Sequence, residues 1–380
     1  MKIALIGPVY PYRGGIAHYT TLLAKALQDA GHEVKVISFK RQYPKWLYPG
    51  QSDRDPSREP LTIPAAYVLD PLYLWTWRAA VDAIVRFSPD IVLFQWWTTF
   101  WAPAFAFVAS GVKAKQIRIV YLIHNVVPHE ARPWDKTLAK WALRSGDAFL
   151  VQSSGQQDAL DALIPDARVT LIKHPVYDMF SAQKMDKIAA RQKLGISEDM
   201  PLVLFFGIIR PYKGLPILID ALGQLNMEDS SIGLLIAGEF WEDVQPYREQ
   251  IARLKLTGKV HIDNRYIPNE ELSTIFSAAD IFAAPYTSAT QSGAVKMALG
   301  FGLPVVITEP VLDETMHAGV DRGIFVCLPN DIPSLKNAIT TALMFGNAGI
   351  LQEVNSAGWQ PLIDYIQRLS PSDQAFRTNA

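Results

Sequence analysis

Short apolar segments alternate with helix-length amphipathic segments along almost the whole chain, and this alternation constrains the fold more than any other feature. The short segments are rich in β-branched residues, as expected for strands covered on both faces. Alternation of this kind predicts parallel sheets with right-handed crossovers, and a restart near Leu202 predicts two doubly wound α/β domains. The expected strands are Ile3–Ile6, Val34–Phe39, Ile91–Gln95, Ile119–Ile123, Ala148–Gln152, Val169–Ile172, Leu202–Phe206, Ile232–Ala237, Val260–Asp263, Ile281–Ala284, Pro304–Thr308 and Gly323–Val326.

The domain boundaries follow from this pattern. A chain of 380 residues exceeds one ordinary core, which favours two domains. We expect them at 1–180 and 181–350, joined by a polar connection at Tyr177–Asp199 with a helical segment at Ala189–Leu194. Residues 351–380 are expected to form a C-terminal helix and polar tail, and we leave open its return to the first domain. The expected helices are His18–Ala30, Pro216–Leu225, Trp241–Lys255, Glu270–Ala278 and Ser334–Phe345.

Composition excludes several classes of protein. The net charge of -1 gives no electrostatic reason to expect nucleic acid as a partner. The single cysteine, Cys327, rules out an intramolecular disulfide and lies in an apolar run, which predicts a buried thiol. The first apolar run ends at Gly7-Pro8 without a cleavage site, so we expect a first strand and a cytoplasmic protein.

Two segments need separate interpretation. Ile91–Val112 is apolar enough to suggest a membrane span, but Gln95, Thr98 and Thr99 interrupt its first half. We therefore expect a buried strand followed by a buried helix there. Arg41–Pro71 breaks the alternation and is too long for an ordinary α/β loop. A surface insertion and an acceptor-binding loop are both open interpretations of it.

Two loops that follow strands carry the features of phosphate-binding sites. Ligands collect beyond the carboxyl ends of strands in an open parallel sheet. Gly14 and Gly15 precede a helix, so no side chain keeps a diphosphate from the backbone N–H groups. In the second half a strand ends at Gly207, and Arg210 and Lys213 then stand just before another helix, where two cations suit two adjacent phosphates.

Two further loops contribute candidates. Gln291-Ser292-Gly293 opens a helix whose first amides can bind phosphate or simply be capped. His124 directly follows an apolar strand, where an imidazole can contact a sugar hydroxyl or a phosphate. His129 and Glu130 are candidates for the acceptor side only. His174 ends the last strand of the first half, and we interpret it as a hinge or as part of the wall between the domains.

Together these segments resemble the large family of retaining glycosyltransferases called group 4. The resemblance runs from Lys2 to about Ala342 and rests on GPVYPYRGG, GHEVKVIS, LIHNVVPHE, FGIIRPYKG, IAGE and FGLPVV. It implies the GT-B fold, in which two Rossmann-like doubly wound parallel-sheet domains face each other across a cleft. The N-terminal domain then takes the acceptor, and the C-terminal domain takes the nucleotide-sugar donor.

The resemblance also implies roles for residues. His124 is the active-site histidine, Arg210 and Lys213 stabilise the leaving diphosphate, and the loop Asn264–Ile267 lies near the base. Retention then needs no nucleophile, and the cations replace a metal, so no metal or other cofactor is expected. The catalytic set is His124, Arg210 and Lys213, and the substrate-binding set is Gly14, Gly15, Gly207, Glu239, Arg265, Ile267, Gln291, Ser292 and Gly293.

The sequence departs from the family at one important place. The family carries two glutamates with seven residues between them, and counting back from Pro304 puts these positions at Ala289 and Met297. A shift by one gives Ser288 and Lys296, so neither count yields a carboxylate. The first glutamate usually contacts the transferred sugar and the second the ribose. The nearest polar replacements are Gln291 and Ser292, with Glu239 or Glu314 as alternatives.

These observations favour transfer of a sugar from a UDP- or GDP-sugar to a glycan or lipid-linked acceptor in cell-surface polysaccharide or glycolipid assembly. Two alternatives stay open: a nucleotide-sugar-binding protein that has lost transfer, and a sugar-nucleotide 2-epimerase. Because such acceptors are often lipid-linked, we also consider peripheral contact with the inner face of the cytoplasmic membrane. The candidates are the aromatic Trp46, Tyr48, Trp75 and Trp77 and the aliphatic Leu47, near the basic Arg41, Lys45 and Arg78. For Trp75 and Trp77 we favour packing in the core over membrane contact.

Overall fold

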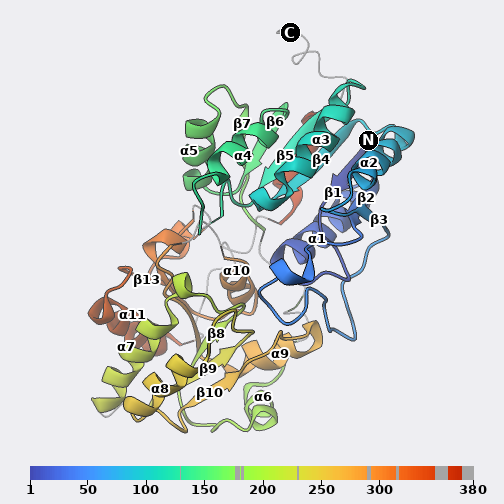
Figure 1. Ribbon diagram of the computed structural model, residues 1–380. Helices are drawn as coiled ribbons and strands as arrows, with labels where there is room; N and C mark the ends of the chain where they lie inside the picture. Colours follow the sequence, from blue (N-terminus) through green and yellow to red (C-terminus); the bar gives the residue numbers. More distant parts are fainter. Residues whose placement is uncertain are drawn as a thin grey trace. The chain divides into compact units, whose positions relative to one another are not determined.

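The computed structural model describes residues 1–128, 130–175, 180, 184–228, 231–288, 292–313, 316–346 and 358–369. The chain divides into two compact units. Unit 1 comprises Met1–Asp55, Pro60–His174 and the chain from Trp359 onward, and unit 2 comprises Pro56–Glu59 and Pro175–Gly358. Each unit is built around one parallel sheet (Figure 1).

The sheet of unit 1 has seven parallel strands in the order β3-β2-β1-β4-β5-β6-β7. Its central strand β4 is buried along its whole length, and β1 and β5 beside it are buried except at their first residues, because helices cover both faces. The strands are β1 (Lys2–Ile6), β2 (Glu33–Phe39), β3 (Ala65–Leu69), β4 (Ile91–Trp96), β5 (Arg118–Ile123), β6 (Ala148–Val151) and β7 (Val169–Leu171).

The helices of unit 1 cover this sheet in two layers. Right-handed crossovers place the helix after β1 on one face and those between β3 and β7 on the other. The first helix buries Tyr19, Leu23 and Leu27, four residues apart, against the sheet. The helices are α1 (Gly15–Asp29), α2 (Leu74–Phe87), α3 (Ala102–Lys113), α4 (Asp135–Leu143), α5 (Ser154–Leu163) and α12 (Gln360–Arg368), with 3₁₀ turns η1 (Lys45–Leu47) and η2 (Thr99–Trp101).

Unit 2 has six parallel strands in the order β10-β9-β8-β11-β12-β13. The side chains of Asp186 and Asp331 cap its first and last helices by accepting from backbone N–H groups. The strands are β8 (Leu202–Phe206), β9 (Gly233–Ala237), β10 (Val260–Asp263), β11 (Ile281–Ala284), β12 (Val305–Thr308) and β13 (Ile324–Cys327). The helices are α6 (Lys187–Leu194), α7 (Leu215–Met227), α8 (Gln245–Arg253), α9 (Asn269–Ala278), α10 (Gly293–Gly300) and α11 (Ile332–Phe345), with 3₁₀ turns η4 (Pro211–Lys213), η5 (Glu309–Val311) and η6 (His317–Gly319).

The strand series and the α/β class are confirmed, with one strand missed. The sequence Ala65–Leu69 forms β3 within the stretch that we expected to be a loop. It is an edge strand and only partly buried, so it lacks the continuous apolar run that marks the other strands. Ile91–Val112 is the expected buried strand and helix, and Cys327 is buried. Among the described residues, none of the helices is long and apolar enough to cross a membrane.

The C-terminal helix α12 packs within unit 1 (Figure 1). The Trp359 ring, just before it, meets the Tyr19 ring edge-on at 4.9 Å between centroids. At the other end of α12, Arg118 Nη1 donates to the carbonyl of Leu369.

The short stretch Pro56–Glu59 belongs to unit 2, where the Arg58 amide donates to Glu270 Oε1 at 3.0 Å. The long loop of the first half therefore contributes residues to the second unit.

Candidate functional site

The strand order identifies where each unit can bind a ligand. In each sheet the order reverses at one point, between β1 and β4 in unit 1 and between β8 and β11 in unit 2. Loops that leave the carboxyl ends of the two strands at such a point diverge to opposite faces, which opens a crevice for a ligand. The glycine loop after β1 and the Arg210/Lys213 loop after β8 both leave these points.

Hydrogen bonds fix the loop after β8 to the loop after β11. The Thr287 amide donates to the Tyr212 carbonyl at 2.7 Å, and Thr287 Oγ1 donates to the same oxygen at 3.1 Å. Gly214 has φ of 69°, and a Cβ there would stand 2.1 Å from the carbonyl oxygen of Pro285. Only glycine allows this approach, so η4 is held against the end of β11.

This attachment places the Lys213 ammonium in a desolvated position. Its Nζ lies 5.3 Å from the centroid of the Tyr286 ring and 3.1 Å from the point where a Cβ of Gly207 would stand. Burial and, secondarily, the Arg210 guanidinium lower the pKa of Lys213 to about 8. An ammonium that is disfavoured in this way gains from an anionic partner, which is the property that a phosphate site requires.

Arg210 lies beside acidic and aromatic neighbours from the loop after β9. Its guanidinium stands 5.3 Å from the Trp241 ring centroid, and Trp241 Nε1 donates to Glu239 Oε2 at 3.3 Å. The two loops approach closely because residue 238 is glycine, where a Cβ would stand 1.9 Å from the Gly207 carbonyl oxygen. Glu239 is buried in this arrangement, next to the aromatic ring that faces Arg210.

The start of α10 is also fixed. Ser292 is the N-cap residue, and its Oγ accepts from the Val295 amide at 3.3 Å. The Tyr286 hydroxyl lies 3.4 Å from the same oxygen, which links α10 to the tyrosine that faces Lys213. Gly293 is the first residue of the helix. Gln291 lies outside the described residues, so the structure gives no placement for it.

The positions of the family's glutamates hold other residues. Met297 is buried, and Lys296 forms a buried ion pair with Asp313, with 2.7 Å between Nζ and Oδ2 and side-chain exposures of 0% and 1%. A pair buried this deeply costs desolvation and is retained only with close geometry. It fixes α10 to the loop after β12. Ala289 and Glu314 lie outside the described residues.

The loop after β10 holds the two other candidates of unit 2. The Arg265 guanidinium contacts carboxylates on both sides, with Nε 2.8 Å from Asp263 Oδ1 and Nη1 3.0 Å from Glu271 Oε1. These contacts raise its pKa and lower the pKa of Glu271. Ile267 is buried. The roles of both residues stay predictions.

In unit 1 the glycine loop leads directly into α1. Gly14 is the N-cap residue with φ of 103°, and its carbonyl accepts from the His18 amide at 3.1 Å. No atom lies within 4 Å of a Cβ built at Gly14 or Gly15. The side-chain face of both glycines is therefore open, and Gly15 is exposed at the start of the helix, whose first amides lack partners within the helix.

His124 follows β5 and is buried beside β4. Its Nε2 lies 2.6 Å from Gln95 Oε1, and an amide oxygen only accepts, so Nε2 carries the proton and Nδ1 is the acceptor. Burial and the nearby His174 lower the pKa of His124 to about 3. The imidazole is therefore neutral at physiological pH and suited to a hydroxyl group, whereas a protonated form that binds phosphate is disfavoured.

The Tyr19 ring contacts both His124 and His174 in unit 1. Its ring meets His124 edge-on at 4.9 Å and His174 at 5.2 Å, and its hydroxyl accepts from Gln152 Nε2 at 2.6 Å. Sequence reasoning missed Gln95 here, as it missed Tyr286 in unit 2. A polar residue near the end of an otherwise apolar strand was the available signal for Gln95. Glu130 is exposed, and His129 lies outside the described residues.

Neither unit offers a metal-ligand set of three or more His, Cys, Asp or Glu side chains among its described residues. The candidates of unit 2 instead place two cations at the reversal point of a sheet. Those of unit 1 place a glycine turn at the other reversal point and a neutral histidine after β5, the strand next to β4. Two such units in one chain define the class of GT-B proteins, and solved structures bear this out.

A glycosyltransferase from Rickettsia africae ESF-5 matches with a TM-score of 0.73 and 15% identity, covering 100% of this chain and 99% of that one. Alr3699/HepE from Anabaena, solved with UDP and glucose, matches with a TM-score of 0.70 and 20% identity, covering 97% and 96%. At these identities the likeness shows the fold alone.

Family models identify the chain more closely. Residues 13–178 match Glycosyltransferase Family 4, and residues 200–344 match Glycosyl transferases group 1. The chain belongs to this family of glycosyltransferases. Among curated relatives, a GDP-mannose:glycolipid 4-beta-D-mannosyltransferase from Xanthomonas campestris pv. campestris is 24% identical over 254 residues, which are 66% of this chain and 64% of that protein. The match thus spans slightly less than two thirds of the relative's own length.

Proposed function

We propose that the protein is a retaining glycosyltransferase that moves a sugar from a UDP- or GDP-sugar to a glycan or lipid-linked acceptor in cell-surface polysaccharide or glycolipid assembly. The observation that carries this proposal is the Lys213 ammonium, desolvated over Tyr286 and accompanied by Arg210 at the reversal point of the second sheet. Two cations at such a point suit the diphosphate of a donor.

The chemistry then depends on the leaving group. As the glycosidic bond to the β-phosphate breaks, negative charge grows on the diphosphate, and Arg210 and Lys213 stabilise that charge. A phosphate oxygen takes the proton of the acceptor hydroxyl as it attacks from the same face, which gives retention without an enzyme nucleophile. No metal or other cofactor is required by this scheme. The amides after Gly14 are assigned to the donor phosphates, and Nδ1 of His124 accepts from a sugar hydroxyl.

The proposed donor is specified only as a nucleotide-sugar, without its base or its sugar. One relative's name specifies GDP-mannose and one structural neighbour is solved with UDP, so both bases are candidates. A thermal-shift screen against UDP-, GDP-, ADP- and dTDP-sugars separates them, because a donor that binds the folded state raises its melting temperature by mass action.

Replacing Lys213 by Ala tests the assignment. We expect transfer to be lost and nucleoside diphosphate binding to weaken at least about tenfold, because a charge-assisted hydrogen bond to phosphate disappears. Arg248→Ala, which removes an exposed cation from α8, is the matched control and should change neither. Unchanged turnover in the Lys213 variant would contradict the proposal.

A nucleotide-sugar-binding protein without transferase activity is the second candidate. It is favoured by one observation: Met297 and the Lys296–Asp313 pair occupy the region where the family carries its second glutamate. Calorimetry with the donor identified by the screen distinguishes the two. Binding without transfer or hydrolysis across a broad acceptor panel supports the second candidate, and transfer to any acceptor excludes it.

Peripheral contact with the inner face of the cytoplasmic membrane stays a prediction. Trp46 and Trp75 have exposed fractions of 77% and 68%, which suits an interface, whereas Trp77 is buried and its Nε1 donates to the Asp70 carbonyl at 2.8 Å. Trp77 is therefore removed from the set of candidate contacts.

A further inference from the structure

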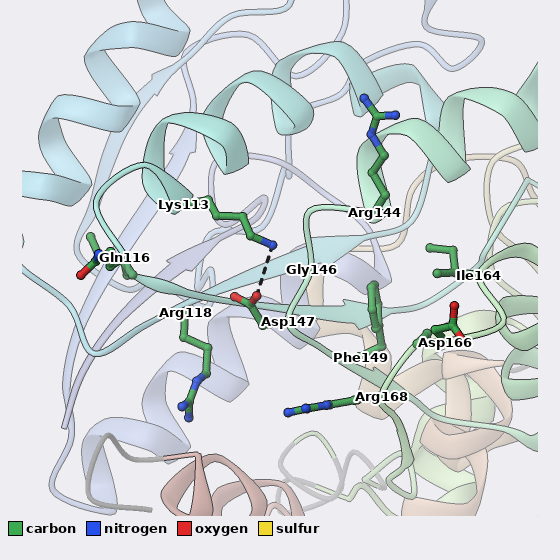
Figure 2. Close-up of a pocket in the computed structure, with 12 residues that line it drawn as sticks. Lys113, Gln116, Arg118, Arg144, Gly146, Asp147, Phe149, Ile164, Asp166 and Arg168 are labelled. Carbon is green, nitrogen blue, oxygen red and sulfur yellow. Dashed lines mark hydrogen bonds and ion pairs between the residues drawn. The ribbon is translucent and has the colours of Figure 1, made fainter. Parts of the chain in front are cut away.

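A cavity opens in unit 1 at the amino ends of its strands, at the end of the sheet opposite to the carboxyl ends that carry Gly14 and His124. It has a volume of about 630 Å³ and lies where β5, β6 and β7 begin (Figure 2). Arg118 is the first residue of β5 and His124 follows its last, so the strand length of six residues separates the cavity from His124 by roughly 20 Å. Within unit 1 the cavity is therefore distinct from His124 and from the glycine loop, which follow the carboxyl ends of the strands.

Cations dominate the rim of this cavity. Lys113, Arg118, Arg144 and Arg168 line it, against the carboxylates Asp147 and Asp166. Asp147 is already engaged, because its Oδ1 lies 3.3 Å from Lys113 Nζ and its Oδ2 accepts from the Ile119 amide at 2.8 Å. The arginines thus keep an excess of positive charge around the opening.

The three arginines reach the cavity from different segments of the chain. Figure 2 shows the guanidinium of Arg168 extending toward that of Arg118, with Arg144 above them at the end of α4. Arg118 Nη1 also donates to the Leu369 carbonyl. Planar guanidinium groups bind phosphate with paired hydrogen bonds.

The inner wall of the cavity is apolar. Phe149, Ile164 and Ala167 line it, and the Phe149 ring stacks on Tyr121 with 5.9 Å between centroids. A Cβ at Gly146 would stand 2.6 Å from Phe149 Cζ, so glycine is needed for the ring to lie there. A cationic rim over an apolar wall favours a ligand that joins a phosphate to an apolar group.

The charged surface continues along α4. Lys140 and Trp141 precede Arg144 by four and three residues, so the three side chains share a face of the helix. All three are exposed, with 40% for Trp141. Tryptophan beside cations suits the interface between water and lipid headgroups.

We propose that this cavity binds a phosphate group attached to an apolar moiety, as a second ligand site of unit 1. Such a phosphate has two sources, a free phosphate compound or the headgroup of an anionic lipid. The site goes beyond the proposed glycosyl transfer, and it lies at the amino ends of the unit 1 strands, whereas Gly14 and His124 follow carboxyl ends.

Binding experiments on the full chain test the site. We expect co-sedimentation with phosphatidylglycerol vesicles, but not with phosphatidylcholine vesicles, if the source is a lipid headgroup. Calorimetric binding of inorganic pyrophosphate without vesicle binding identifies a free phosphate compound. The double variant Arg144→Ser/Arg168→Ser should weaken the binding of whichever probe binds at least about tenfold, because two charge-assisted contacts are removed.

Controls separate this site from the donor site and from loss of folding. Arg248→Ser removes one exposed arginine in unit 2 and should leave binding unchanged. Pyrophosphate also fits the proposed donor site, so its binding to the cavity is measured in the Lys213→Ala background, with and without the two cavity substitutions. If the double variant does not fold, Arg144→Gln alone replaces it, since Arg144 is exposed at the end of α4. Absence of binding to both phosphatidylglycerol vesicles and pyrophosphate, or equal binding by wild type and cavity variants, overturns the proposal.

Discussion

Single side chains at the ends of strands carry the chemistry proposed for this protein, and their environments set their charge. Lys213 is held over Tyr286 and loses part of its hydration, whereas His124 is kept neutral between Gln95 and Tyr19. The sequence identified Lys213 and His124 by position. It did not identify Tyr286 or Gln95 as the neighbours of these residues, because their approach depends on how neighbouring strands pair.

The pKa of Lys213 predicts a pH dependence of donor binding. The amine is mostly protonated below its folded-state pKa of about 8, so affinity for nucleoside diphosphate should be full there and fall as pH rises above 8. The decrease approaches about tenfold per pH unit if only the ammonium binds. Because the folded-state value lies below the unfolded one, this group makes folding more favourable as pH rises between them, so unfolding does not explain the loss.

Lys213→Arg supplies the control, since a guanidinium stays charged throughout this range. Calorimetric titrations between pH 7 and roughly 10 should show the decrease in wild type and a flat profile in the variant. A wild-type profile that is equally flat would contradict the assigned pKa.

Gln95 predicts a tautomer of His124. We expect nitrogen NMR of the imidazole to show a neutral ring protonated at Nε2, unchanged between pH 5 and 8, because the folded-state pKa is about 3. Gln95→Leu removes the acceptor and should shift the equilibrium toward the Nδ1–H form while donor affinity falls. A variant that retains the Nε2–H spectrum would show that Gln95 does not set the tautomer.

At the scale of elements, glycines decide how closely the functional loops approach. Gly238 places the loop after β9 against the Gly207 carbonyl, whereas Gly15 opens α1 beside open space. Substitution by alanine is therefore predicted to have different effects on folding stability at Gly15 and at Gly238.

Gly15→Ala should fold with nearly wild-type stability but bind nucleotide-sugar less tightly, because its methyl group enters the space assigned to phosphate. Gly238→Ala places a Cβ 1.9 Å from a carbonyl oxygen and should lower the melting temperature as well as donor affinity. Thermal unfolding and calorimetry measure both. Normal donor affinity of the Gly15→Ala variant would show that the glycine loop is not part of the donor site.

At the scale of the whole molecule, repeated strand–helix alternation predicted two parallel-sheet units, and the structure and the family agree with it. The prediction worked because doubly covered strands are apolar over their whole length. It failed at β3, a partly exposed edge strand inside a polar stretch. The return of α12 to unit 1 through Trp359 and Leu369 was left open, since no local pattern encodes a contact across so many residues.

The sequence by itself determined the fold class, most of the strands and the loops that carry Gly14–Gly15, His124, Arg210 and Lys213, because strand and loop signals are local. Tertiary structure alone decided that Lys296 pairs with Asp313 and that cations from four different segments gather around the cavity at the start of β5. Contacts of this kind depend on strand order and on the burial of side chains from distant segments. Strand order and this burial are established only when the whole sheet has formed.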